Sequence, residues 1–85
     1  AAPNPFNPRT IVRFDLPRAG HARIDVVDLR GRRVARLVDA ELPVGRHDVA
    51  FTGRDVNGQA LPSGIYFVQL QSAAGNMTRK VTLLQ

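Results

Sequence analysis

The chain contains no cysteine and no tryptophan, and it has one tyrosine and one methionine among its 85 residues. Without cysteine there are neither disulfide bonds nor thiol chemistry, so the fold must be stabilised by packing. No apolar run approaches the roughly 20 residues of a membrane-spanning helix, and the first residues lack the pattern of a signal peptide. We expect one small domain without membrane insertion. An export address, if there is one, lies within the domain or upstream of it.

The net charge is +5, and eleven of the twelve basic residues are arginines. This balance raises the question of anionic partners such as nucleic acids or acidic glycans. The arginines are spread along the chain, and only "RGRRVAR" is a local cluster. Its planar guanidinium groups suit phosphates or acidic polysaccharides, and the candidates for such an anionic contact are Arg30, Arg32, Arg33 and Arg36. Neighbouring carboxylates and the lack of exposed aromatic residues for base stacking argue against nucleic acid.

Short segments of alternating apolar and polar residues recur between turns rich in Gly, Pro, Asn and Asp. This alternation is typical of β-strands. The segments cover residues 10–16, 21–29, 33–38, 46–51, 65–71 and 77–85. Their spacing predicts an all-β fold, a small antiparallel immunoglobulin-like β-sandwich of about seven strands over residues 10–85. Residues 1–9, which include "NPFNP", are interpreted as a linker end and incoming segment.

Two local patterns refine this prediction. The alternation in residues 21–29 changes phase at Val27, which indicates a β-bulge. Residues 65–68 are apolar on both faces, which indicates a central strand covered on both sides. The predicted core consists of Phe14, Ile24, Val26, Leu37, Val49, Phe51, Tyr66, Val68, Leu70, Val81 and Leu83.

The sequence offers little for catalysis. The two histidines stand alone, without the spacing of a metal site, and neither serine lies in a G-x-S-x-G motif. No spacing nominates a pair of carboxylates. "DVNG" at residues 55–58 resembles the start of a calcium loop but lacks the closing glutamate, which leaves room only for a weak surface ion. We expect no enzymatic activity and no cofactor.

Several motifs occur in a fixed order along nearly the whole chain. "NPFNPRTIVRFDLPRAG" is followed by "VVDLRGRRVARL", by "SGIYFVQLQ" and by the final "RKVTLLQ". Together they resemble the C-terminal sorting domain of the bacterial type IX secretion system. The layout is also similar to the immunoglobulin-like domain of flagellar hook-capping proteins. Val27 and Phe51 depart from the family pattern, which often has tyrosine and tryptophan at these positions, but both stay apolar.

The resemblance implies a C-terminal secretion signal and cell-surface attachment domain of a larger exported bacterial protein. The outer-membrane components of the type IX system would recognise it, and a sortase-like peptidase would remove it and attach the upstream cargo domain to anionic lipopolysaccharide. The protein would then be secreted or held at the cell surface after passing the periplasm and the outer membrane.

The resemblance also implies which residues are functional. The residues of the export-recognition motifs are Ser63, Gly64, Ile65, Tyr66, Phe67, Lys80, Val81 and Leu83. The middle motif contributes Asp28, Gly31, Arg32 and Val34. A terminal strand at a sheet edge offers unpaired backbone groups that a receptor can extend by strand addition, with Lys80 as a point charge. We expect Phe6 to pack against the sandwich before the first strand.

A second interpretation remains open. The chain could be a structural or carbohydrate-binding immunoglobulin-like accessory module of an extracellular enzyme or adhesin, because sandwiches host many functions. A carbohydrate binder should present a row of exposed aromatic side chains. Here the aromatic residues fall mostly on predicted core positions, which favours the sorting domain.

Overall fold

A computed structural model of the chain describes residues 10–84, which contain six β-strands and no helix. The strands are β1 (Thr10–Leu16), β2 (Gly20–Val27), β3 (Arg33–Leu42), β4 (Gly45–Phe51), β5 (Gly64–Ser72) and β6 (Gly75–Leu83). The predicted all-β class is therefore confirmed, with six strands in the described part instead of about seven. No helix in that part is long and apolar enough to cross a membrane. The predictions for "NPFNP" and Phe6 lie outside the described residues.

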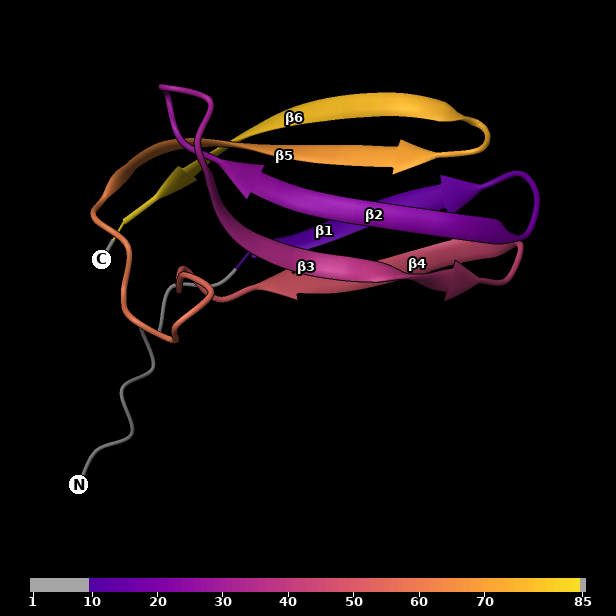
Figure 1. Cartoon of the computed structure of the whole chain (residues 1–85), viewed down its shortest axis with the longest axis horizontal. Helices are drawn as coiled ribbons and strands as arrows, with labels where there is room; N and C mark the ends of the chain where they lie inside the picture. Colours follow the sequence, from indigo (N-terminus) through magenta and orange to yellow (C-terminus); the bar gives the residue numbers. More distant parts are fainter. Residues whose placement is uncertain (1–9, 85) are drawn as a thin grey trace.

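The strands form two antiparallel sheets that pack face to face. One sheet has the order β3-β2-β5-β6, and the other contains β1 and β4. In Figure 1 the four-stranded sheet lies in front, with β1 behind β2 and β4 behind β3. The β2–β3 loop, the β4–β5 loop and the end of β6 lie at the same end of the sandwich, on the left of Figure 1. This topology brings sequence motifs from both halves of the chain together at that end.

The hydrophobic core follows from the alternation in each strand. The predicted core residues that are buried are Phe14, Ile24, Val26, Phe51, Tyr66, Val68, Leu70, Val81 and Leu83. Leu37 and Val49 are only partly buried and pack against this core. The core also contains residues that the prediction omitted, namely Val12, Leu16, Ala22, Ala35 and Leu61. The omitted alanines, Ala22 and Ala35, are both buried.

The irregularity predicted at Val27 is present, but it arises from the neighbouring strand. The pairing of β2 with β3 shifts register between Ile24 and Asp25 and again between Val26 and Val27, whereas the pairing of β2 with β5 is regular. The extra residues, Leu37 and Val34, belong to β3. Val27 therefore keeps the normal alternation of β2 and lies on the outer face of the four-stranded sheet.

One arginine side chain forms a hydrogen bond between the two strands, β1 and β6, that each have an unpaired edge. Within residues 10–84, β1 pairs only with β4 and β6 pairs only with β5, so both β1 and β6 have a free edge. Arg79 lies on β6 opposite Val68, and its Nη1 donates a hydrogen bond of 3.1 Å to the backbone carbonyl of Arg13 on β1. This contact links the two sheets where no ladder hydrogen bonds connect them.

Tyr66 anchors the long β4–β5 connection to the core. Its ring packs edge-to-face against Phe51, with centroids 6.4 Å apart. Its hydroxyl donates a hydrogen bond of 2.7 Å to the backbone carbonyl of Pro62, four residues upstream. The same local arrangement is known as a tyrosine corner in β-sandwiches. It fixes the path of the chain just before β5 begins.

Tyr66 also makes the stability of the domain sensitive to alkaline pH. Burial, and secondarily the charge of Asp28, raises the pKa of Tyr66 above 10.0. The folded state favours the neutral phenol, so the free energy of unfolding is unaffected by this group at neutral pH and falls as pH rises above about 10, where the unfolded tyrosine ionises. We expect Tyr66→Phe to cost about 1 kcal/mol at pH 7 by loss of the hydrogen bond and to remove this alkaline decline.

Urea unfolding at a series of pH values tests this prediction. Because Tyr66 is the single tyrosine, the absorbance of tyrosinate reports its titration in the folded chain without interference. Equal alkaline declines in the original chain and in Tyr66→Phe would contradict the assignment.

Candidate recognition surface

The first export-recognition motif is divided between the two faces of β5. Tyr66 points into the core, whereas Ile65 and Phe67 point to the outer face of the four-stranded sheet. Ile65 is 38% exposed and Phe67 is half-buried. β5 lies between β2 and β6, as predicted for a central strand. In the described part of the chain no layer packs over its outer face, so the expected cover on both sides is not seen there.

The second motif, on β6, is divided in the same way. Val81 and Leu83 are buried, whereas Lys80 is exposed on the outer face. Lys80 lies directly opposite Phe67, and Phe67 lies directly opposite Val27 on β2. These three residues form a continuous row across β2, β5 and β6, which we call the outer-face row. Val27 is only 7% exposed, so Phe67 and Lys80 are the members that a partner can reach. The sequence alone could not place Val27 beside Phe67 and Lys80, because these residues lie far away along the chain.

The middle motif forms a tight loop around one carboxylate. Oδ1 of Asp28 accepts hydrogen bonds from the backbone N–H groups of Arg30 (2.9 Å) and Arg32 (3.0 Å), and Oδ2 accepts one from Nε of Arg32 (3.0 Å). Gly31 has a φ of 80°, a left-handed conformation that suits glycine. Val34 follows the loop on β3 and packs against the core. The motif therefore specifies the shape of the loop.

The electrostatics of Asp28 fit this role. Its partial desolvation alone would raise the pKa of the carboxyl, but the hydrogen bonds from the backbone and side chain of Arg32 and the backbone of Arg30, with the charge of Arg32, together lower it. The carboxylate therefore stays ionised and bonded to its own loop. Because its bonded oxygens are committed within the loop, Asp28 does not offer a free negative charge to a partner.

The middle motif and the first recognition motif line one cleft. Its volume is about 230 Å³, and its walls are formed by residues 28–30 and Arg32 on one side and by residues 63–66 on the other. Figure 1 shows the β2–β3 loop near the start of β5 at the left end of the sandwich. The residues that line the cleft belong to these two segments. Segments more than thirty residues apart in the sequence thus share one surface feature.

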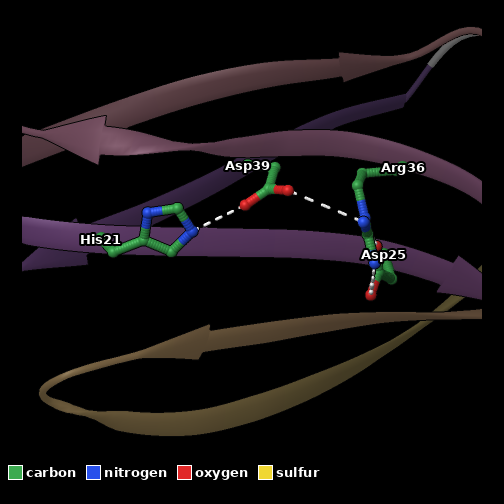
Figure 2. A network of polar contacts seen from close by, with 4 residues as sticks. All are labelled: His21, Asp25, Arg36 and Asp39. Carbon is green, nitrogen blue, oxygen red and sulfur yellow. Dashed lines mark hydrogen bonds and ion pairs between the residues drawn. The ribbon is translucent and has the colours of Figure 1, made fainter.

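The four candidate arginines do not form one free patch. Arg32 is paired with Asp28, and Arg36 is paired with Asp25 at 2.8 Å and with Asp39 at 3.6 Å. Figure 2 shows how Arg36 lies between the two carboxylates. No hydrogen bond or ion pair joins the side chains of Arg30 and Arg33 to another residue in the range 10–84. Only these two keep their charge free for an external anion.

The network in Figure 2 continues to His21, whose Nε2 lies 2.6 Å from Oδ1 of Asp39. The hydrogen bond with His21 is the largest influence on Asp39 and lowers its pKa. This network pairs most of the charges in the middle of the β2–β3 half of the outer face. Val27 and Arg33, which lie opposite each other at the end near the 28–32 loop, are not part of it, and Nε of Arg23 is buried without a hydrogen-bond partner in the described residues.

The structure also places the residues considered for catalysis or metal binding. In the described part of the chain, no three His, Asp or Glu side chains gather as a metal site would require. The carboxylate of Asp55 accepts backbone hydrogen bonds from Asn57 (2.8 Å) and Gln59 (2.9 Å), so it organises a turn. His47 stacks on Phe14, with ring centroids 5.4 Å apart. These groups therefore have structural roles.

Comparison with known proteins supports the resemblance noted in the sequence. No curated protein and no solved structure matches the chain, so the similarity to hook-capping proteins stays a prediction. A family model described as a secretion system C-terminal sorting domain matches residues 2–83, nearly the whole chain. The matched range contains the middle motif, both recognition motifs and the outer-face row. The chain belongs to the C-terminal sorting domains of type IX secretion.

Proposed function

We propose that the export machinery recognises this domain in its folded form, through the outer-face row and the free edge of β6. The domain is a type IX sorting signal and so directs export across the outer membrane. In our proposal, a sortase-like peptidase then removes the domain and attaches the upstream cargo at the cell surface. The domain itself performs no catalysis.

The position of the outer-face row carries this proposal. The recognition motifs contain buried residues and outward-facing residues. Packing in the core accounts for the buried residues but not for the outward-facing ones. Tyr66, Val81 and Leu83 are buried in the core, so their packing accounts for their presence. Phe67 and Lys80 contribute little to the core, and they meet on an uncovered face. A partly exposed aromatic side chain can serve as an apolar anchor for a partner, and the neighbouring charge adds electrostatic specificity.

The unpaired edge of β6, next to the outer-face row, offers the receptor a second site of contact. β6 spans nine residues and pairs on one side only in the described structure. Its free edge allows a receptor strand to add by backbone hydrogen bonds, while the outer side chains provide specificity. A contact with anionic lipopolysaccharide falls to Arg33, whose side chain pairs with no residue in the range 10–84 and which lies beside the outer-face row, opposite Val27.

The alternative function as a carbohydrate-binding module has less support. Of the aromatic residues in the range 10–84, Phe14, Phe51 and Tyr66 are buried, and Phe67 is half-buried. A single aromatic side chain on the outer face does not form the row that stacking on a polysaccharide requires. We therefore keep the sorting function as the proposal.

An export assay tests the proposal with point variants. The chain is fused to the C-terminus of a reporter protein in a host with an active type IX system. We expect Phe67→Thr combined with Lys80→Glu to reduce the secreted fraction at least about tenfold, since a loss of 1.4 kcal/mol in recognition corresponds to that factor. Threonine keeps the strand propensity at position 67, and urea unfolding of the variant measures the stability that is lost with the half-buried phenylalanine.

Arg46→Glu provides the control, because Arg46 is an exposed cation on β4 of the other sheet. It makes the same charge change away from the outer-face row and should leave export unchanged. Normal export of a folded double variant would contradict recognition through this row. Mass spectrometry of the reporter at the cell surface tests the later steps, since retention of the domain there would contradict its removal.

A further inference from the structure

The cleft beside the 28–32 loop has features that its role in the fold does not require. Leu29 is 70% exposed and lines the cleft. Exposure of this leucine to water does not stabilise the turn in which it lies. Opposite it stands Ile65, which is also exposed. The two apolar side chains face a common cleft of about 230 Å³, which can take one apolar side chain of a partner.

The loop that presents Leu29 is rigid. Besides the bonds to the Asp28 carboxylate, the backbone N–H of Asp28 donates to the carbonyl of Arg32 (2.9 Å) and that of Gly31 donates to the carbonyl of Asp28 (2.9 Å). The loop therefore holds Leu29 and Arg30 in place before any partner arrives. Preorganisation of this kind lowers the entropy cost of binding.

The charge of the cleft is one-sided. The carboxylate of Asp28 and the guanidinium of Arg32 neutralise each other at 3.0 Å. Arg30, on the rim, has no hydrogen bond or ion pair through its side chain to any residue between 10 and 84. The unbalanced charge at the cleft is therefore positive and adjacent to the apolar walls. A partner that fits must carry a negative charge next to an apolar group.

We propose that this cleft binds an acidic segment of a protein of the export machinery, with an apolar side chain between Leu29 and Ile65 and a neighbouring carboxylate paired with Arg30. The assignment of the partner rests on the proposed function above. A protein segment fits better than a glycolipid phosphate, because the apolar walls would have no counterpart in a phosphorylated sugar. The cleft lies next to the outer-face row, because Ile65 borders both. It gives the partner a further contact besides the row and the edge of β6.

The chain supplies a matched control for this proposal. Residues 55–59, "DVNGQ", form a loop with the same backbone hydrogen bonds as residues 28–32, "DLRGR". Gly31 and Gly58 both have a φ of 80°. Val56 is 66% exposed at the position equivalent to Leu29, and Asn57 is equivalent to Arg30. Substitutions in the second loop therefore introduce the same new side chain on the same backbone geometry outside the cleft.

A direct titration tests the ligand chemistry. The isotope-labelled chain is titrated by NMR with a short capped peptide of alternating glutamate and leucine, and with its glutamine–leucine counterpart. We expect the acidic peptide to shift the amide signals of Leu29, Arg30 and Gly64, and the neutral peptide to have little effect. Arg30→Glu should weaken binding at least about tenfold, and Asn57→Glu should not. Absence of shifts at these amides, or equal shifts with both peptides, would overturn the proposal.

A parallel titration with inorganic pyrophosphate separates the two sources of negative charge. If pyrophosphate shifts the same amides at concentrations where the acidic peptide does not, the cleft is a phosphate site and the proposal is wrong. In the export assay, Leu29→Ser and Arg30→Glu should each reduce the secreted fraction about fivefold, whereas Val56→Ser and Asn57→Glu should not. If the unchanged domain fails to export the reporter, the proposed function fails, while the peptide titration still decides the chemistry of the cleft.

Discussion

Replacing Phe51 by alanine is expected to lower the free energy of unfolding by about 3–5 kcal/mol, the usual cost of removing a buried phenylalanine. Phe51 is only 1% exposed and is among the largest fully buried side chains of the core. It ends β4 and meets Tyr66 of β5, so it joins the two sheets at the end where the recognition motifs lie. The substitution therefore leaves a cavity between the layers.

Such a loss is a large share of the stability of a domain of this size. At about 0.05–0.15 kcal/mol per residue, a chain of 85 residues has a total stability of about 4–13 kcal/mol. Urea unfolding followed by circular dichroism measures the effect. Phe67→Ala is the matched control, because it removes the same side chain from the half-buried outer face and should cost less than half as much. Similar losses for both variants would contradict the assignment of Phe51 to the core.

Truncation of the chain after Arg79 is expected to unfold the domain. The truncation removes Val81 and Leu83, which are 9% and 3% exposed. Their burial contributes about 1.5–3 kcal/mol each. It also removes the residues of β6 that pair with residues 64–67, so the first recognition motif loses its neighbour in the sheet. The combined loss is comparable to the whole stability of a small domain.

This expectation changes how a truncation should be interpreted. Loss of export after such a deletion has two causes that the assay does not separate, unfolding of the domain and loss of a recognition signal. Truncation after Leu83 is the control, because it keeps both buried residues and removes only the exposed Leu84 and the final residue. We expect that chain to unfold in urea at nearly the original midpoint. If the chain truncated after Arg79 instead unfolded cooperatively at the original urea midpoint, the end of β6 would be dispensable for the fold.

The sequence was sufficient for the elements of this fold, because strict alternation over five to seven residues specifies both the strand and its buried face. β1 begins and ends where the pattern of residues 10–16 predicts. β3 is longer than predicted and continues to Leu42. Residues 39–42 show no clear alternation of their own, and their pairing with residues 20–23 of β2 extends the strand. The two extra residues of β3 could not be assigned from one strand alone, since a bulge is a mismatch between two strands.

The candidate site was less accessible to sequence reasoning. The motif residues of β5 and β6 were identified as a group, but their division into buried and outward members depends on the direction of each side chain relative to the second sheet. Tyr66 and Phe67 are neighbours in sequence, yet one supports the core and the other faces solvent. The cleft joins residues 28–32 to residues 63–66, a meeting that only the topology reveals.

The hydrogen bond from Arg79 to the carbonyl of Arg13 has a consequence for self-association. A free strand edge is a template on which a second molecule can pair and start aggregation. At β1 this edge is obstructed by a charged side chain from β6, so an approaching strand would have to displace the guanidinium and leave it unpaired. This obstruction keeps the β1 edge closed to identical neighbours. Within residues 10–84 the edge of β6 stays open, so pairing with another strand is directed to the side of the sandwich that carries the second motif.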